Sequence, residues 1–335
     1  MVFYTIKISY SNSNNYSINF NIMNALLFPG QGSQVVGMGS EIYKQFDLVK
    51  KIFKQADEKL NFSISKLILE GPENELQLTK NTQPAILTVS FSIFQILKDE
   101  FGFDFSPFKC FAGHSLGEYS ALVCSNSLKF DDALYLLHER GKAMQEAVPV
   151  GDGSMIAVLG MQINDLYDLL KTRSQEEGIC EIANDNADGQ VILSGDKSSV
   201  EKFQKILKDK KIKSIPLKVS APFHCSLMKP AAKIMENKIN NTEFVEPKYK
   251  IVNNVTANLE TSTDTIKKLL IEQIFSTVKW RESLIKMANT GVKTFVEIGP
   301  GKVLTGMVKR TVKESNTFSI NSIADIKNFI NEFKK

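Results

Sequence analysis

From residue 23 onward the chain alternates short apolar runs with longer amphipathic stretches. Segments rich in apolar residues predict strands at residues 25–28, 108–112, 250–255 and 294–298. Apolar side chains at helical spacing predict helices over about 40–60, 84–99 and 131–147. Apolar strands that alternate with helices are typical of an α/β fold with a mainly parallel sheet, and we predict that fold class.

The middle of the chain follows a different pattern. After Gly-Asp-Gly at residues 151–153 come a strand, a helix, two strands, a helix and a strand, at residues 155–159, 164–177, 179–183, 190–194, 197–210 and 214–219. This order is typical of a ferredoxin-like α+β unit. We expect a large α/β catalytic domain, residues 23–150 and 220–335, with a small ferredoxin-like domain of residues 151–219 inserted into it.

Residues 1–22 differ from the rest of the chain. They are rich in Asn, Ser, Tyr and Ile, with one lysine and no acidic residue. They lack the basic start and apolar stretch of a secretory signal, and the arginines of a transit peptide. We interpret them as a disordered N-terminal extension or as the product of a start codon assigned too early, with a targeting role as the alternative.

Composition excludes several classes of protein. Of 335 residues, 43% are hydrophobic and 23% charged, and no apolar run approaches the roughly 20 residues that span a bilayer. The net charge of +4 is too small and scattered to favour nucleic-acid binding, although it suits an anionic small molecule or an acidic partner. Four cysteines and three histidines show neither disulfide pairing nor metal-ligand spacing. We expect a cytoplasmic protein with free thiols that binds no metal, nucleic acid or membrane.

The main chemical signal lies at residues 113–117, which read Gly-His-Ser-Leu-Gly. This fits the G-x-S-x-G nucleophile elbow, in which a strained turn from strand to helix exposes a serine hydroxyl. A predicted strand precedes the motif and a predicted helix begins near Leu116, as the elbow requires. Ser115 is therefore the candidate nucleophile of an α/β-hydrolase-like domain. The alternative is a glycine-lined turn in which the serine caps a helix.

A serine nucleophile needs a base to take its proton. His224 follows the strand predicted at residues 214–219, a usual place for a catalytic base, although a structural role is an equal alternative. His138 is expected on the exposed face of its helix, and the elbow should turn the side chain of His114 away from Ser115.

No carboxylate stands out as the third member of a triad. Asp185 and Asp188 are the nearest acids between the serine and the histidine, and both lie in the inserted unit. A serine–histidine dyad, with the imidazole oriented by a backbone carbonyl, is an equal alternative.

Arg140 falls on the apolar stripe of the helix predicted over residues 131–147. A buried guanidinium without an anion is costly, and its planar fork suits a carboxylate. Two partners remain open: an acidic side chain of the protein or the carboxylate of a ligand.

Several motifs occur together in the order of a known family. They are FPGQGSQ at 28–34, TQPA at 82–85, GHSLGE at 113–118, Arg-Gly at 140–141, the loop around His224, and EIGPG at 297–301. On these residues the chain resembles the malonyl-CoA:acyl carrier protein transacylases of fatty-acid synthesis. The resemblance runs from about residue 23 to about residue 313.

The resemblance implies a catalytic role for five residues. Ser115 would be acylated, with His224 as its base, and the backbone carbonyl of Gln273 would orient the imidazole. The backbone amides of Gln31 and Leu116 would form the oxyanion hole, which stabilises the charge of the tetrahedral intermediate.

The resemblance also implies how the acyl group is held. Arg140 would bind the malonyl carboxylate, with Gln83 lining the pocket beside it. Phe223 resembles members that take malonyl groups and disfavours bulkier acyl units. Three further residues are second-tier candidates: Asn184, Asn186 and His114.

The implied reaction is a ping-pong transfer. Malonyl-CoA would acylate Ser115, CoA would leave, and the phosphopantetheine thiol of holo-acyl carrier protein would take the malonyl group. Malonyl-CoA is then a substrate, and we expect no bound cofactor and a monomeric enzyme. The alternatives are a stand-alone acyltransferase of a polyketide assembly line and a serine acyl-hydrolase, in which water resolves the acyl-enzyme. Four basic residues are candidates for docking CoA phosphates or an acidic carrier, or are simply solvated: Lys302, Lys309, Arg310 and Lys313.

Overall fold

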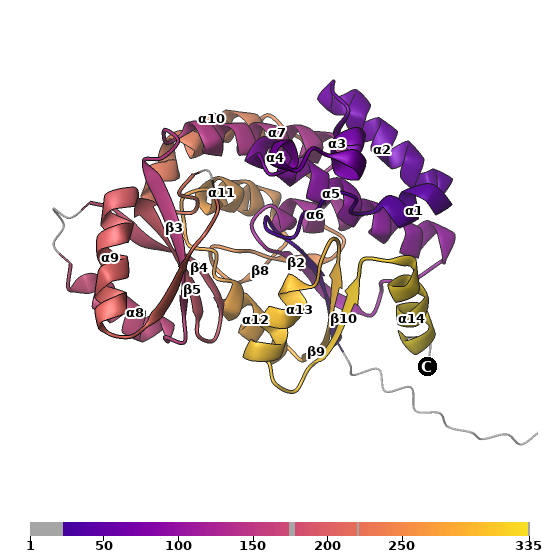
Figure 1. The fold of residues 1–335 in the computed structure, drawn as a ribbon. Helices are drawn as coiled ribbons and strands as arrows, with labels where there is room; N and C mark the ends of the chain where they lie inside the picture. The colour runs from indigo at the N-terminus through magenta and orange to yellow at the C-terminus, as the bar shows by residue number, and fades with distance from the viewer. Residues whose placement is uncertain (1–22, 174–177, 220, 334–335) are drawn as a thin grey trace, which may run out of the picture.

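The computed structural model describes residues 23–173, 178–219 and 221–333 (Figure 1). These residues form a six-stranded sheet in the order β10-β9-β1-β2-β7-β8 and a four-stranded sheet in the order β4-β5-β3-β6. The segment interpreted as an N-terminal extension, residues 1–22, lies outside the described residues.

Four of the six strands of the large sheet, β1, β2, β7 and β9, lie where strands were predicted, whereas β8 and β10 were not predicted. Its strands are β1 (Met23–Phe28), β2 (Phe108–Gly113), β7 (Lys250–Val252), β8 (Leu259–Glu260), β9 (Val292–Ile298) and β10 (Asn316–Ile320). Neighbouring strands run parallel except β7 and β8, which are antiparallel. The predicted α/β class with a mainly parallel sheet is confirmed.

Burial on both faces explains why β1 is apolar at successive positions. Leu26 and Phe28 pack into the core on one side of the sheet, and Ala25 and Leu27 pack into a second core on the other side. Successive side chains of a strand point to opposite faces, so a sheet covered on both sides needs apolar residues throughout.

Helices supply both coverings (Figure 1). Helices α5, α6 and α7 contribute to the first core, and α12 and α13 contribute to the second. The helices around the large sheet are α1 (Ser40–Gln45), α2 (Asp47–Leu60), α3 (Ile64–Glu70), α4 (Glu73–Leu76), α5 (Thr79–Gln95), α6 (Gly117–Cys124), α7 (Phe130–Glu146), α10 (Lys229–Asn240), α11 (Thr263–Gln273), α12 (Trp280–Asn289), α13 (Val303–Thr311) and α14 (Ile323–Phe333).

Two predicted helices differ from those observed. The stretch predicted as one helix over 40–60 is α1 and α2, separated by Phe46 in an extended conformation. Helix α5 begins at Thr79, so Pro84 lies inside it. Because proline has no N–H, the carbonyl of Lys80 lacks its helical donor, and Nδ1 of His138 donates to it instead at 3.0 Å. His138 is therefore engaged in supporting α5.

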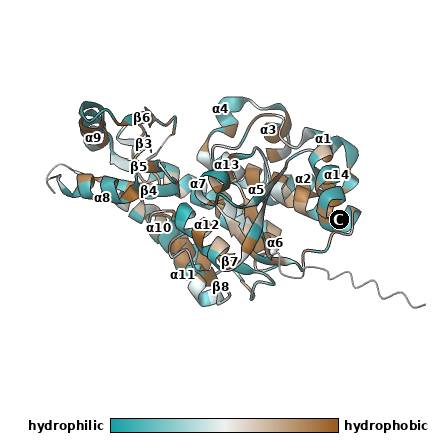
Figure 2. Cartoon of the chain, turned by 90° about the horizontal axis from the view of Figure 1, so that it is seen from below, coloured by the Kyte–Doolittle hydropathy of each residue, from teal (hydrophilic) through white to brown (hydrophobic). Residues whose placement is uncertain are grey.

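The second sheet has the element order predicted for residues 151–219. It comprises β3 (Gly153–Leu159), α8 (Ile163–Lys171), β4 (Cys180–Ala187), β5 (Gln190–Asp196), α9 (Lys197–Asp209) and β6 (Lys213–Pro216), with all strand pairs antiparallel. Figure 2 shows hydrophilic and hydrophobic residues on both α8 and α9, and Phe203 and Leu207 of α9 are buried. Amphipathic helices of this kind cover one face of a sheet with their apolar side.

Some element ends differ from the prediction. Helix α8 ends at Lys171, β6 at Pro216 and β7 at Val252, and residues 174–177 lie outside the described ranges. Strand β4 also contacts the segment before α12, because Val278 N donates to Ala183 O at 2.9 Å. Among the described helices, none is both long and apolar enough to cross a membrane.

Candidate active site

Ser115 lies in a sharp turn between β2 and α6. Its φ of 53° is in the left-handed region, which is strained for a residue with a side chain. A Cβ on Gly113 would lie 1.8 Å from the backbone carbon of Gly117, so the turn closes only with glycine at position 113. This is the geometry of a nucleophile elbow.

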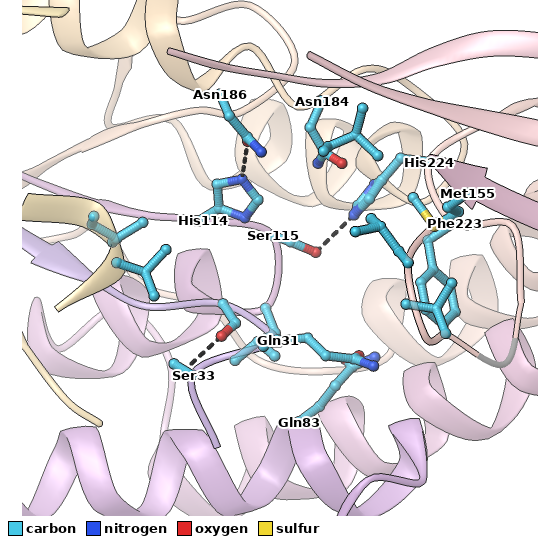
Figure 3. A pocket seen from close by; sticks show the side chains of 18 of the residues that line it. Gln31, Ser33, Gln83, His114, Ser115, Met155, Asn184, Asn186, Phe223 and His224 are labelled. Atoms are coloured by element: carbon cyan, nitrogen blue, oxygen red, sulfur yellow. Dashed lines mark hydrogen bonds between the residues drawn. The ribbon is translucent and has the colours of Figure 1, made fainter. Parts of the chain in front are cut away.

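His224 is the imidazole within reach of the serine. Ser115 Oγ lies 2.8 Å from His224 Nε2 (Figure 3). The other ring nitrogen, Nδ1, lies 2.8 Å from the backbone oxygen of Gln273. A carbonyl only accepts, so Nδ1 carries the proton and Nε2 is free to accept the proton of the hydroxyl.

Neither acid considered for a triad contacts His224. Asp185 instead pairs with Arg281, with an N–O distance of 3.0 Å, and Asp188 lies 3.8 Å from the same guanidinium. The arrangement around the serine is therefore a dyad completed by a carbonyl, which was one of the two alternatives.

Burial keeps the His224 imidazole neutral. The residue is 5% exposed. Burial, and secondly the positive charge of Arg140, lower the pKa of His224 from 6.5 to about 3. A base must be unprotonated to accept the Ser115 proton, so the lowered pKa leaves His224 competent at neutral and mildly acidic pH.

We expect the His224 ring to stay neutral as the pH falls from about 8 to about 5, because its lowered pKa places protonation below that range. An NMR titration of the ring C–H resonances measures this, with a His224→Gln protein to assign the signal. A His224 signal that titrates with a midpoint near the ordinary imidazole value would contradict this expectation.

Arg140 is enclosed beside the serine and is 1% exposed. Its Nη1 donates to Gln83 Oε1 at 2.7 Å. Its Nη2 donates to Gln273 Oε1 at 2.9 Å and to Ser115 Oγ at 3.1 Å. The ring of Tyr119 lies 5.9 Å from the guanidinium carbon. All of these partners are neutral.

The lack of an anionic partner favours one of the two interpretations of Arg140. Within the described residues no Asp or Glu forms an ion pair with it. The nearby acid Glu118 bonds to Gln273 instead, and burial raises the pKa of Glu118 to about 7. A buried guanidinium without an anion is costly, so the geometry favours a ligand carboxylate over an internal salt bridge.

The backbone amides of Gln31 and Leu116 belong to residues that line the same cavity as Ser115. Leu116 immediately precedes α6, and Gln31 lies in the turn after β1. Neither amide donates to an acceptor within the described part of the chain. Unpartnered amides beside a helix N-terminus suit developing negative charge.

The reactive groups open into one cavity of about 250 Å³. Its apolar wall includes Met144, Met155, Ile192, Leu217 and Phe223. Figure 3 shows Met155 and Phe223 beside His224. A small apolar cavity with one guanidinium suits a short acyl group that ends in a carboxylate. No cluster of metal-binding side chains occurs among the described residues. All four cysteines lie within those residues, and they are free and buried.

The three second-tier candidates line this cavity as well: Asn184, Asn186 and His114. His114 Nε2 lies 2.8 Å from Asn186 Oδ1, so a hydrogen bond joins the elbow to β4 (Figure 3). We expected the His114 side chain to turn away from Ser115. It makes no bond to the serine but does face the cavity, because Asn186 of β4 holds it there.

Sequence reasoning missed the polar network beneath the serine. Asn254 Oδ1 accepts from Ser115 N at 2.7 Å, and its Nδ2 donates to Gly113 O at 2.7 Å. Glu118 accepts from both Asn253 and Asn254. A glutamate in the first turn of a helix is ordinarily explained by the helix dipole, and paired asparagines after a strand usually indicate a turn. Neither pattern therefore indicated a buried network.

Comparison with known proteins agrees with this geometry. A family model described as an acyl transferase domain matches residues 25–333. The malonyl CoA-acyl carrier protein transacylase of Bacillus subtilis is 43% identical over 314 residues, which cover 93% of this chain and 97% of the relative. The relative of the same name from Haemophilus influenzae is 41% identical over 310 residues, which cover 92% and 98%.

Solved structures point to the same family. An acyl carrier protein S-malonyltransferase from Vibrio cholerae has 38% identity and a TM-score of 0.87, covering 91% of this chain and 99% of its own. PlMCAT, a malonyl-transacylase solved with the type II polyketide acyl-carrier protein AntF, has 38% identity and a TM-score of 0.89, covering 92% and 99%. Together with the elbow, the dyad and the buried arginine, these matches show that the chain belongs to the malonyl-CoA:acyl carrier protein transacylase family.

Proposed function

We propose that the protein transfers the malonyl group of malonyl-CoA to the phosphopantetheine thiol of holo-acyl carrier protein, and thereby supplies fatty-acid biosynthesis. The observation that carries this is the 3.1 Å contact between Ser115 Oγ and Nη2 of Arg140, a buried guanidinium with only neutral partners. Malonyl thioesters present an electrophilic carbonyl and a carboxylate separated by one methylene. Nucleophile and guanidinium therefore lie where one malonyl group can meet both.

The first half-reaction acylates the enzyme. His224 Nε2 takes the proton of Ser115 as Oγ attacks the thioester carbonyl. The amides of Gln31 and Leu116 stabilise the tetrahedral oxyanion. His224 then returns the proton to the departing CoA thiolate, which leaves a malonyl ester on the serine.

The second half-reaction reverses these roles. The carrier's thiol gives its proton to His224 and attacks the ester, and the proton returns to Ser115 as the malonyl-carrier leaves. A thioester is converted to an ester and back to a thioester, so the overall transfer is close to balanced and reversible.

The carboxylate end of the malonyl group rests on Arg140. Gln83 and Gln273 fix the guanidinium through Nη1 and Nη2, while Nε has no partner among the described residues. The guanidinium can therefore donate to a bound carboxylate while it keeps its hydrogen bonds to these two amides. Phe223 closes the wall of the cavity and limits the bulk of the acyl group.

The carrier approaches from outside the cavity. Leu304 and Met307 of α13 line the cavity, and the basic residues at and just beyond this helix are exposed: Lys302, Lys309, Arg310 and Lys313. Their positions support docking of CoA phosphates or of an acidic carrier surface.

Several features stay predictions. They are the monomeric state, the cytoplasmic location, the α/β-hydrolase-like and ferredoxin-like descriptions, and the domain limits 23–150, 151–219 and 220–335.

The relatives from Bacillus subtilis and Haemophilus influenzae are named as transacylases, which does not favour the hydrolase or the polyketide alternative.

Steady-state assays with malonyl-CoA distinguish a transferase from a hydrolase by measuring malonyl-carrier and free malonate together. We expect malonyl-carrier to dominate when holo-carrier is present, with slow malonate release in its absence. Malonate release that is equally fast with and without carrier would identify a hydrolase instead.

A further inference from the structure

Glu118 is a buried acid to which the transfer mechanism assigns no role. It lies in the first turn of α6, directly after the elbow, and is 0% exposed. Its Oε1 accepts from Asn253 Nδ2 at 2.6 Å. Its Oε2 accepts from Gln273 Nε2 at 2.7 Å and from Asn254 N at 3.1 Å. Three N–H donors thus converge on one carboxyl group.

Two of these donors belong to residues that hold the reactive groups. Asn254 clamps the strained elbow, because its side-chain amide bonds to Ser115 N and to Gly113 O, both at 2.7 Å. Its backbone N–H in turn is held by Glu118.

Gln273 forms hydrogen bonds with three residues of the site, His224, Arg140 and Ser115. Its backbone oxygen accepts from His224 Nδ1 at 2.8 Å, and its Oε1 accepts from Arg140 Nη2 at 2.9 Å. Its Nε2 donates to Ser115 O at 3.1 Å as well as to Glu118. The Gln273 amide therefore links the Glu118 carboxyl group to the Arg140 guanidinium.

Resting on the function proposed above, we propose that Glu118 is a positioning residue for malonyl transfer, acting through Asn254 and Gln273. Through Asn254 it holds the elbow so that Ser115 stays within reach of His224. Through the Gln273 amide it fixes the orientation of the Arg140 guanidinium. Glu118 thus affects the reaction only through the positions of Ser115 and Arg140, and it contacts neither the substrate nor the reacting atoms.

The donors explain why a carboxylate is needed at this position. Asn253 cannot reverse its amide, because its Oδ1 already accepts from Val255 N at 2.8 Å and from Thr256 N at 3.2 Å. Gln273 cannot reverse either, because its Oε1 faces Arg140. Glutamine at position 118 would place an NH₂ group against one of these fixed donors, whereas a carboxylate accepts from all three.

The test is the Glu118→Gln protein, assayed for malonyl and acetyl transfer to holo-carrier at a pH of about 8, above the raised pKa of Glu118. We expect kcat for malonyl transfer to fall by about 10- to 100-fold, the effect of a small misplacement of reacting groups. We also expect the preference for malonyl over acetyl groups to fall, because the guanidinium loses its alignment.

The matched control is Asp57→Asn. Asp57 is a half-buried carboxylate in α2 that accepts from Ser65 N at 2.7 Å and does not line the cavity. It undergoes the same change from carboxylate to amide. This variant should lower the melting temperature while leaving the malonyl-to-acetyl preference unchanged.

A second variant, Gln273→Met, keeps the backbone carbonyl that orients His224 but removes the amide that joins Glu118 to Arg140. We expect it to lower the same malonyl-to-acetyl preference. In the double variant this preference should fall little further than in the more impaired of the two single variants. If Glu118→Gln does not fold, Gln273→Met alone decides, and an unchanged preference overturns the proposal. A folded Glu118→Gln protein with wild-type kcat and wild-type preference would also overturn the proposal. So would a double variant in which the losses of preference of the two single variants multiply. Failure of the wild-type protein to transfer malonyl would instead refute the proposed function.

Discussion

Replacing Ser115 by alanine is expected to lower malonyl transfer by at least about 10⁴-fold, because its hydroxyl is the one that lies 2.8 Å from the base, His224 Nε2. The measurement is steady-state formation of malonyl-carrier, with circular dichroism to confirm folding. The matched control is Ser120→Ala, which removes a buried hydroxyl of α6 that has no hydrogen-bond partner among the described residues. Activity of Ser115→Ala comparable to that of the control would disprove the nucleophile.

Replacing Arg140 by alanine is expected to lower kcat/KM for malonyl-CoA by about 10²- to 10³-fold, the cost of truncating one member of a buried charge pair. The effect on acetyl-CoA should be much smaller, because an acetyl group has no carboxylate to bind. Parallel kinetics with the two thioesters measure the change in preference.

The control for this prediction is Arg281→Ala. Arg281 pairs with Asp185 at 3.0 Å and does not line the cavity. Its loss should reduce stability and leave the malonyl-to-acetyl preference intact. Equal losses for both thioesters in Arg140→Ala would show that the buried guanidinium only supports the fold.

The strand-to-helix elbow could be predicted because its signal is local. A mainly apolar strand, two glycines and a serine lie within ten residues, and the steric requirement at Gly113 is met inside the motif. Strand β1 could be predicted for a similar reason, because a strand that is buried on both faces has a continuous apolar run. The start of helix α5 was predicted too late, at Pro84 instead of Thr79, because the bond from His138 to Lys80 O, which compensates for Pro84, joins distant segments.

The partners of the serine are distant in sequence, and their residue types carry weak signals. His224 follows Ser115 by 109 positions, so position alone left its role open, and only the family resemblance paired the two. The stripe around Arg140 predicted burial, yet its partners are the amides of Gln83 and Gln273, which no charge pattern reveals.

The network below the elbow could not be predicted at all. Glu118 and Asn254 are polar residues of types that are usually exposed, and nothing in the sequence marks them as buried. Their roles depend on three segments meeting beneath one turn, which only the folded structure brings together.

Intact-protein mass spectrometry of the enzyme, mixed with malonyl-CoA alone and then chased with holo-carrier, tests whether a malonyl-Ser115 intermediate carries the transfer. We expect one malonyl group per chain, mapped to the Ser115 peptide, that persists in buffer and moves to the carrier during the chase. An adduct that forms equally on Ser115→Ala, or that is lost to water as fast as to the carrier, would contradict this mechanism.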